Sequence, residues 1–462
     1  MKMSMIAPER ILHFVDHKIY KEGESTYIYV CSNNRLYRAD NMVMQLLSYK
    51  GKSVAEAKRS LEGVLSEDQM NTLIETLAQD GSIEEKSSEP VTTARAEGNL
   101  RMISLLLVQG CNLRCTYCYG EDGQYSDSGI MELETAKRSV DLMMQETQAD
   151  EVTVCFFGGE PLLNFKLIKE VVEYCREVEK RTNKIIRFTM TTNGTLISPK
   201  IEEFIINNRI SVQLSVDGDK ETQNANRFYS NRRGTYDVII KRTQKLREKG
   251  LLSVRATVTP FNFDLISIFN HLDSLNFRQI VLSPAFNMLS PEDYVRLADA
   301  YIAFFLYLEK KLKEGDYRQV LKNKLFKQEL AKINNSTMRT KACGVARNLA
   351  AIDIHGSLYP CQRFVSRKES VLGDVQHGYQ TKEDFLRSLS AANNNKCSNC
   401  FARNLCVTGC PHSNVEETGD MNTPSEDYCE YTRRIQDTMI HIYLRLSDTD
   451  KQVLFPSEQT IN

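Results

Sequence analysis

Six short apolar runs alternate with helical patterns between residues 100 and 285, and this alternation narrows the possible folds more than any other feature. The apolar runs are Met102–Val108, Glu151–Phe157, Ile185–Thr191, Ile210–Val216, Leu252–Thr259 and Arg278–Ser283. Helical patterns occupy Glu132–Gln148, Phe165–Arg181, Ser198–Asn207, Thr235–Lys249 and Asp264–Leu275. Repeated strand–helix units predict a parallel sheet, either an open doubly wound sheet or a partial barrel. In both architectures, functional residues gather at the carboxyl ends of the strands.

The composition narrows the possible partners and location. The chain of 462 residues carries 59 basic and 60 acidic residues, so its net charge of −1 gives no reason to expect nucleic acid or an anionic membrane as partner. Its apolar runs are far shorter than the roughly 18 residues that would span a bilayer. The N-terminal MKMSMIAPER lacks the apolar core of a signal peptide. We therefore expect a cytoplasmic protein.

The distribution of the 13 cysteines indicates metal ligation. In a reducing compartment, clustered thiols are more often metal ligands or catalytic groups than disulfides. Cys31, Cys155 and Cys175 are scattered among apolar residues and are predicted to be core residues. The other ten form an early and a late group: Cys111, Cys115 and Cys118, then Cys343, Cys361, Cys397, Cys400, Cys406, Cys410 and Cys429.

The early group directly follows the first predicted strand, in VQGCNLRCTYCYG. Three thiolates on one short loop suit three corners of a four-iron four-sulfur cluster, which leaves one iron open to another ligand. A zinc site would require a fourth nearby ligand, and no further cysteine or histidine lies close in sequence. The early group therefore predicts an iron–sulfur cluster.

The spacing Cys111-x3-Cys115-x2-Cys118, with Tyr117 before the last cysteine, resembles the signature of the radical S-adenosylmethionine (SAM) enzymes. This resemblance implies a partial (β/α)6 barrel, in agreement with the repeats above. It also implies that the open iron chelates the amino and carboxylate groups of SAM. An electron from the reduced cluster would cleave SAM to methionine and a 5′-deoxyadenosyl radical, which abstracts a hydrogen atom from the substrate.

Further motifs resemble the SAM contacts of this family. Gly158-Gly159-Glu160-Pro161 is similar to the motif that holds the SAM amino group, and Thr192-Asn193-Gly194 is similar to a turn near the ribose. Many relatives have His-Asp before the arginine that pairs with the SAM carboxylate, whereas this chain has Gln223-Asn224, which leaves the local hydrogen bonds open. The implied SAM contacts are Tyr117, Gly158, Gly159, Glu160, Thr192, Asn193, Ser215 and Arg227.

The late group resembles the SPASM domain, which carries two auxiliary four-iron four-sulfur clusters in radical SAM peptide-modifying enzymes. The alternative is a pair of zinc ribbons, but these would need paired CxxC motifs, and only one is present. The resemblance assigns Cys397, Cys400, Cys406 and Cys429 to the outer cluster and leaves Cys343, Cys361 and Cys410 for the inner one. Counting ligands then gives the inner cluster one open iron.

An open iron near a radical site invites a substrate thiolate, which would be deprotonated and held in place. A substrate carbon radical could couple to that sulfur and form a thioether, as in sactipeptide- and ranthipeptide-type maturases, which this arrangement resembles. The competing hypothesis is that His355, His412 or another side chain fills the fourth position. We expect His412 to be a surface or packing residue instead.

The sequence pattern of residues 1–85 predicts a small winged-helix-like module. Strands are expected at Tyr27–Cys31 and Arg35–Arg38, followed by helices capped by Asp40, by Ser53 and by Ser66 with Gln69. The module resembles the peptide-recognition element of enzymes that modify ribosomal peptides, which implies that a leader peptide adds a strand to a sheet edge. We expect that edge to carry Tyr27, Tyr29 and residues 35–38. DNA binding is less favoured because the module is not strongly basic.

The whole chain therefore resembles a SPASM-type radical SAM maturase. The expected organisation is a recognition module (1–85), a linker (86–99), the barrel (100–285), a helical bridge (286–340), the cysteine-rich domain (341–435) and a C-terminal helix with tail (436–462). The expected reaction is thioether formation in a leader-bearing, cysteine-rich precursor peptide, with a reduced flavodoxin or ferredoxin-type donor. The alternatives are other peptide modifications (carbon–carbon crosslinking, decarboxylation, epimerisation or sulfatase maturation) and a zinc-stabilised scaffold that binds peptide or DNA.

Overall fold

A computed structural model describes residues 8–79, 99–337, 343–389 and 395–456 of the chain. The predicted linker lies outside the described residues except for Asn99. Within the described ranges, no helix is both long enough and apolar enough to cross a bilayer.

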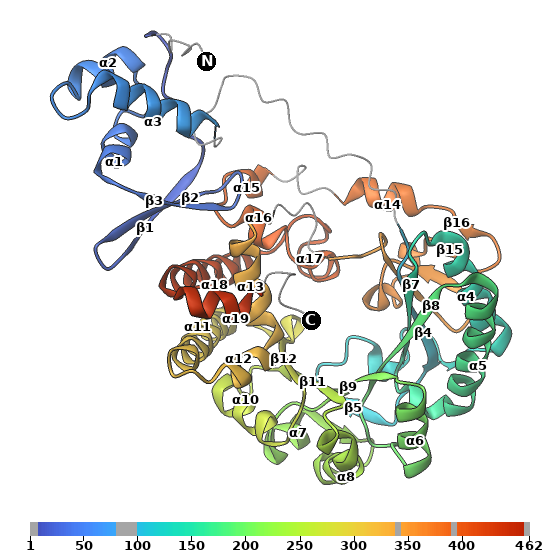
Figure 1. The fold of residues 1–462 in the computed structure, drawn as a ribbon. Helices are drawn as coiled ribbons and strands as arrows, with labels where there is room; N and C mark the ends of the chain where they lie inside the picture. Colours follow the sequence, from blue (N-terminus) through green and yellow to red (C-terminus); the bar gives the residue numbers. More distant parts are fainter. Residues whose placement is uncertain (1–7, 80–98, 338–342, 390–394, 457–462) are drawn as a thin grey trace.

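Six parallel strands form the centre of the fold, as the sequence predicts. They are β4 (Met102–Gln109), β7 (Glu151–Gly158), β8 (Ile185–Thr192), β9 (Ser211–Ser215), β11 (Leu252–Val258) and β12 (Gln279–Pro284). They pair in this order in one curved sheet. Figure 1 shows the strands in an arc with their crossover helices on the outer side. The partial barrel is confirmed.

The crossover helices occupy the predicted positions, with two differences. They are α4 (Leu133–Glu146), α5 (Phe165–Thr182), α6 (Pro199–Asn207), α7 (Lys220–Asn226), α8 (Tyr236–Arg242), α9 (Gln244–Glu248) and α10 (Leu265–Ser274). The short helix α7 was not predicted. The single helix predicted over 235–249 is interrupted at Thr243, where φ and ψ are −104° and 0°. Both the backbone N–H and the hydroxyl of Thr243 donate to the carbonyl of Ile239, at 3.0 and 2.8 Å.

The sheet continues beyond the barrel into the cysteine-rich region. Strand β13 (Leu349–Ile352) pairs in parallel with β4, and β14 (Ser357–Tyr359), β15 (Gly373–Asp374) and β16 (Gly378–Tyr379) follow in antiparallel order. The first strand after Cys343 is therefore hydrogen-bonded to the first strand of the barrel. Short additional strands are β5 (Leu113–Cys115), β6 (Gly129–Ile130) and β10 (Arg227–Tyr229).

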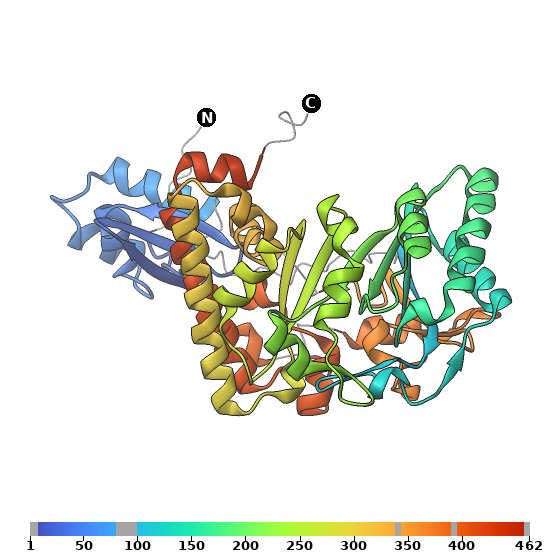
Figure 2. The same cartoon turned by 90° about the horizontal axis from the view of Figure 1, so that it is seen from below.

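Long helices close the side of the barrel beside β12. Helices α11 (Pro291–Lys313), α12 (Tyr317–Lys322) and α13 (Lys324–Asn334) fill the predicted bridge, and α11 and α13 pack on α18 (Glu426–Arg445). Figure 2 shows α11 and α18 between the barrel and the N-terminal module. The remaining helices are α14 (Lys382–Ser388), α15 (Asn395–Ser398), α16 (Arg403–Cys406), α17 (Pro411–Thr418) and α19 (Asp448–Leu454).

The N-terminal module contains one more strand than expected. An antiparallel sheet in the order β1 (His17–Glu22), β2 (Ser25–Val30), β3 (Arg35–Ala39) precedes α1 (Asn41–Leu47), α2 (Val54–Ser60) and α3 (Glu67–Gln79). The predicted caps at Asp40, Ser53 and Ser66 are all formed. The expected edge was partly wrong, because Tyr27 and Tyr29 lie on the central strand β2 and Tyr29 is completely buried.

Strand β1 attaches the module to α18 through polar contacts. Asp437 pairs with Lys18 at 2.5 Å and accepts from the Tyr20 hydroxyl at 2.8 Å, while Arg445 pairs with Glu22 at 3.1 Å. The Asn404 amide in α16 donates to the carbonyl of Cys31 at 2.7 Å. Figure 1 accordingly shows the module beside α15 and α16.

Candidate active site

The early cysteines lie together beyond the end of β4. Burial raises the pKa of the Cys111 thiol to about 12, and the nearby thiols of Cys115 and Cys118 act in the same direction. Strand β5 places Cys115 directly opposite Arg227 of β10. One guanidinium nitrogen of Arg227 lies 3.8 Å from the Cys115 sulfur and can donate to it. The fold thus brings together the three predicted ligands and the arginine predicted to bind the SAM carboxylate.

The glycine pair at the end of β7 permits close contact between two backbone segments. A Cβ atom on Gly159 would lie 2.1 Å from the carbonyl oxygen of Gly110, and one on Gly158 would lie 2.4 Å from that of Val108. Gly158 also has a φ of +128°, which side-chain-bearing residues rarely adopt. Only glycine can therefore bring this turn against the cysteine loop.

Glu160 is completely buried where β7 and β8 end. Its carboxylate accepts from the Asn193 backbone at 2.8 Å, the Thr192 hydroxyl at 2.7 Å and the Leu162 backbone at 3.1 Å. Burial raises its pKa to about 7, although these hydrogen bonds act in the opposite direction. The carboxylate is thus held in place and can accept a further bond from an ammonium group.

Asn193 links this turn to the cysteine loop. Its side-chain amide nitrogen donates to the side-chain oxygen of Asn112 at 2.9 Å and lies 3.9 Å from the Cys111 sulfur. Its own side-chain oxygen accepts from the Thr195 hydroxyl at 2.7 Å, and Thr195 in turn accepts from Asn112. Neither Asn112 nor Thr195 was among the predicted site residues, because their role depends on contacts between distant segments.

Asp217 is a further site residue. It is completely buried, binds the Nε of Arg227 at 3.1 Å and accepts from the Tyr117 hydroxyl at 2.5 Å. The Arg227 guanidinium lies 5.1 Å from the centre of the Tyr117 ring. Asp217 therefore orients two predicted SAM contacts at once. Asp217 lies two residues after Ser215, which the sequence analysis named as a SAM contact in its place. Ser215 lies in register with Arg255 on β11.

The departure at Gln223-Asn224 does not leave hydrogen bonds unsatisfied. The Asp217 backbone donates to the Gln223 side-chain oxygen at 2.8 Å, and the Gln223 amide donates to the Thr235 hydroxyl at 3.0 Å. Asn224 accepts from the backbones of Thr235 and Tyr236 at 2.8 and 3.0 Å. Two amides thus support Asp217 and Arg227 where many relatives have His-Asp.

The late cysteines form the two groups that the sequence predicts. Burial raises the pKa of Cys361 to about 12, and the nearby thiols of Cys410 and Cys343 raise it further. Burial also raises the pKa of Cys406 to about 12, in the same direction as the nearby thiols of Cys429, Cys397 and Cys400. We call these the inner group (Cys343, Cys361 and Cys410) and the outer group (Cys397, Cys400, Cys406 and Cys429).

An aromatic pair separates the early group from the inner group. The rings of Tyr119 and Tyr125 meet edge to face at 5.9 Å. Arg363 lies 5.4 Å from the Tyr119 ring centre and can donate to the Cys410 sulfur at 3.6 Å. Cys361 packs against the buried cluster that contains Tyr125 and Leu106 of β4. The inner group is therefore adjacent to the barrel interior.

The two candidate histidines differ in environment. His355 is exposed and pairs with Asp127 at 2.8 Å. His412 is buried and packs edge to face on Phe364 at 5.0 Å, as a packing residue would. Burial lowers its pKa to about 3, and Arg363 and Arg367 act in the same direction. Its Nδ1 has no hydrogen-bond partner among the described residues.

The donor chemistry fits the implied groups. The early loop offers three soft thiol ligands, while Glu160 and Arg227 offer an acceptor for an ammonium and a cation for a carboxylate. The late cysteines offer soft ligands in the same way. Within the described ranges, no three His, Cys, Asp or Glu side chains converge on a position for a single metal ion.

Residues 105–268 match the family model described as the Radical SAM superfamily. The matched segment runs from β4 to α10 and includes the early cysteine group. Two curated proteins resemble longer parts of the chain. A cysteine-type anaerobic sulfatase-maturating enzyme of Clostridium novyi is 25% identical over 365 residues, covering 72% of this chain and 93% of that protein. The radical SAM cyclopropyl synthase TigE of Paramaledivibacter caminithermalis is 20% identical over 470 residues, covering 91% and 94%.

Two solved structures share the fold. Native anSMEcpe with bound AdoMet and the Cp18Cys peptide has a TM-score of 0.64 at 22% identity and covers 75% of this chain and 100% of that chain. SuiB of Streptococcus suis bound to the precursor peptide SuiA has a TM-score of 0.53 at 16% identity and covers 90% and 99%. The radical SAM α/β fold is confirmed.

The buried position of Glu160 predicts that SAM binding depends on pH. The carboxylate, which would accept from the SAM ammonium, is lost as the pH falls through about 7, because burial raises this pKa from 4.5. The dissociation constant of SAM should therefore rise about tenfold for each pH unit below 7. Anaerobic calorimetry with cluster-loaded protein measures this. Glu160→Gln should bind weakly at every pH, and a flat wild-type profile from about pH 8 to about pH 6 would contradict the assignment.

Proposed function

We propose that this protein is a radical SAM maturase that forms cysteine thioether crosslinks in a ribosomally made, cysteine-rich precursor peptide. The cofactors would be SAM and three four-iron four-sulfur clusters, held by the early, inner and outer groups. A flavodoxin or ferredoxin-type protein would supply electrons, and the reaction would take place in the cytoplasm. The proposal is supported above all by the three-thiol inner group adjacent to the barrel interior.

The hard chemistry would come from the bound groups, since a reduced early cluster with SAM supplies a hydrogen-abstracting radical. The chain itself provides positioning. Asp217 fixes Arg227 and Tyr117, and the buried Glu160 fixes the opposite side of the SAM site. Tyr119, Tyr125 and Arg363 lie between this site and the inner group. A peptide cysteine held beside Cys343, Cys361 and Cys410 would thus lie near a radical formed in the barrel.

The inner group contributes three thiols, and this count supports an external fourth ligand. The competing candidate from the chain is His412, because it is neutral and its buried Nδ1 has no partner among the described residues. The two hypotheses make different spectroscopic predictions. With a substrate thiolate as ligand, the native precursor changes the spectrum of the inner cluster and a cysteine-free precursor does not. With His412 as ligand, the spectrum changes in His412→Ala instead.

The N-terminal module supports a peptide as the substrate. Strand β3 is an edge strand within the described part of the chain, whereas the opposite edge β1 packs on α18. A cavity of about 170 Å³ lies beside β3 and is lined by Tyr37 and Arg38 on the strand and by Leu73 and Leu77 on α3. The Tyr37 hydroxyl is buried there without a partner among the described residues. An added peptide strand could pair with β3 and place a side chain in this cavity.

A second candidate function is sulfatase maturation or another radical modification of a peptide. It is favoured by the similarity to the sulfatase-maturating enzyme over 93% of that protein. The similarity to the cyclopropyl synthase covers 91% of this chain, and the name of that enzyme indicates a product other than a thioether. The products differ in mass and in free thiols, so one experiment separates these candidates.

Incubating the reduced, cluster-loaded protein with SAM and a leader-bearing, cysteine-rich precursor peptide should remove two hydrogen atoms per link and consume one free thiol. Mass spectrometry after alkylation measures both. Cys361→Ser should abolish the crosslink but still form deoxyadenosine, because the early cysteines remain. Cys155→Ser is the matched control, since this buried thiol already lies between the hydroxyls of Thr189 and Ser104. A modified precursor that keeps all its thiols would exclude the thioether product.

A further inference from the structure

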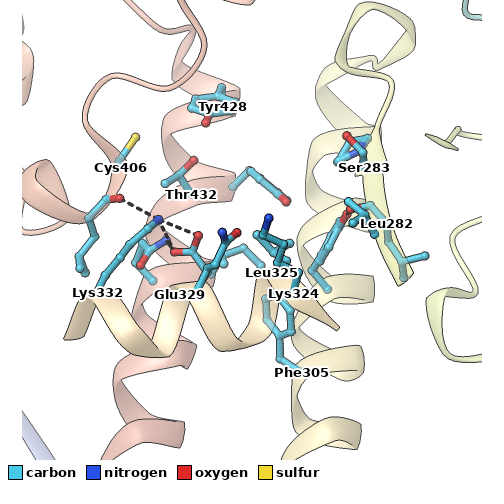
Figure 3. A pocket seen from close by; sticks show the side chains of 18 of the residues that line it. Leu282, Ser283, Phe305, Lys324, Leu325, Glu329, Lys332, Cys406, Tyr428 and Thr432 are labelled. Carbon is cyan, nitrogen blue, oxygen red and sulfur yellow. Dashed lines mark hydrogen bonds and ion pairs between the residues drawn. The ribbon is translucent and has the colours of Figure 1, made fainter. Parts of the chain in front are cut away.

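A cavity of about 370 Å³ lies at the side of the barrel and reaches Cys406 of the outer group at one end. Figure 3 shows Lys324, Glu329 and Lys332 of α13 between α18, with Tyr428 and Thr432, and β12, with Leu282 and Ser283. The cavity extends from Arg255 on β11 to Cys406 on α16. Phe286, Tyr428 and Tyr431 form an aromatic wall, with ring centres 5.4 to 6.2 Å apart.

The cavity carries two cations without carboxylate partners. Lys332 is neutralised by Glu329 at 2.6 Å. No carboxylate among the described residues pairs with Arg255 or Lys324, although both side chains are exposed to the cavity. Arg255 donates to the Ser283 hydroxyl at 2.7 Å. The positive charges of Arg363 and Arg227 also lie near Arg255. The local excess of positive charge would favour an anionic ligand.

A buried acceptor also lacks a partner in this cavity. Gln436 is 4% exposed, and its amide nitrogen donates to Glu329 at 2.8 Å. Its side-chain oxygen has no hydrogen-bond partner among the described residues. A buried unpaired carbonyl costs free energy unless a donor satisfies it. A peptide N–H group has the required chemistry.

The cavity lies between the barrel strands β11 and β12 and helix α18, which also contacts the N-terminal module. The α18 face that carries Asp437 and Arg445 contacts the module, and its opposite face, with Thr432 and Gln436, lines the cavity. At the other end, Arg255 lies in register with Ser215, at the carboxyl end of β9.

We propose that this cavity binds an acidic segment of the substrate peptide, with carboxylates at Arg255 and Lys324 and a backbone N–H donated to the Gln436 side-chain oxygen. This inference rests on the proposed peptide-modifying function and adds a requirement to it. The substrate must carry Asp or Glu in the part that enters the barrel. The aromatic wall would pack against the intervening side chains.

The test compares two leaderless core peptides of the precursor, one native and one with every Asp and Glu replaced by Asn and Gln. Fluorescence anisotropy with cluster-loaded protein gives their dissociation constants. The wild type should bind the amide form about tenfold more weakly, because charge-assisted hydrogen bonds are lost. In the double variant Arg255→Met, Lys324→Met, the two peptides should bind equally. The matched control Arg278→Met, Lys327→Met removes the same charges outside the cavity and should keep the tenfold difference.

Equal binding of both peptides by the wild type would overturn the inference, and this comparison stands even if the double variant fails to fold. A difference that persists in the double variant would also overturn it. Failure of the proposed function is distinguishable, since the native peptide would then bind preferentially but emerge without a thioether. Equal binding together with a thioether product would instead leave the function intact and remove the acidic-segment site.

Discussion

Replacing Cys115 with alanine should abolish the formation of 5′-deoxyadenosine from SAM. A three-cysteine loop has no spare ligand for a cluster, and Cys115 is also the sulfur opposite Arg227 in the β5–β10 ladder. The loss should be complete with or without precursor peptide. Anaerobic incubation with SAM and a chemical reductant, followed by chromatography of the nucleosides, measures it.

The iron content of Cys115→Ala shows whether this variant loses only the early cluster. Three clusters correspond to about twelve irons per chain, and Cys115→Ala should retain about eight because the late groups are untouched. The matched control is Cys155→Ser, which should keep both the iron and the deoxyadenosine. SAM cleavage at the normal rate in Cys115→Ala would refute the early group as the SAM-binding cluster site. So would zinc without sulfide in the wild type.

Replacing Gly159 with alanine should reduce SAM cleavage by about a hundredfold or more, whereas Gly110→Ala should be close to neutral. A Cβ on Gly159 would lie 2.1 Å from the Gly110 carbonyl oxygen, and neither backbone can yield without moving the cysteine loop or Glu160. A Cβ on Gly110 would meet only a Val108 methyl at 3.7 Å, an ordinary contact. A hundredfold lower rate of SAM cleavage corresponds to an activation free energy that is about 2.7 kcal/mol higher.

The two variants add a methyl group on either side of the same backbone contact, between Gly159 and Gly110. Deoxyadenosine formation and SAM affinity are the measurements, and circular dichroism during thermal unfolding reports whether the barrel stays folded. If Gly159→Ala cleaves SAM as fast as Gly110→Ala, the turn at 158–160 does not shape the site. A loss in both variants would mean that the Cys111 loop itself is sensitive, independently of the contact.

The sequence predicts the barrel well because each strand segment carries several buried apolar residues and is followed by a helix of ordinary length. β4 is buried along nearly its whole length, whereas β8, β9, β11 and β12 bury about every second residue. The repeated strand–helix alternation leaves little choice of topology, and all six strands appear where expected. The strands that the sequence analysis did not predict are short or polar. Strand β1 reads HKIYKE, and β13 to β16 have two to four residues each, so their pairing depends on tertiary contacts.

The site residues also divide into those that the sequence predicts and those that it does not. Residues within motifs, such as Gly159, Glu160 and Asn193, come together as expected because each ends a neighbouring parallel strand. Asp217 and Gln223 were not selected because their importance lies in what they hold rather than in a recognisable spacing. Likewise, the unpaired charge of Arg255 becomes apparent only when α13 and α18 are packed beside it.

The pairing of β13 with β4 constrains how several crosslinks could be made. Four consecutive pairs, Leu349–Met102 to Ile352–Leu105, join the cysteine-rich region to the first barrel strand. The strand that follows Cys343 is thus hydrogen-bonded directly to the strand that leads into the early cysteine group. If a precursor receives more than one link, the reaction site would not move from one target carbon to the next. The peptide must instead advance past a fixed reaction point, so its own sequence spacing would determine which residues are joined.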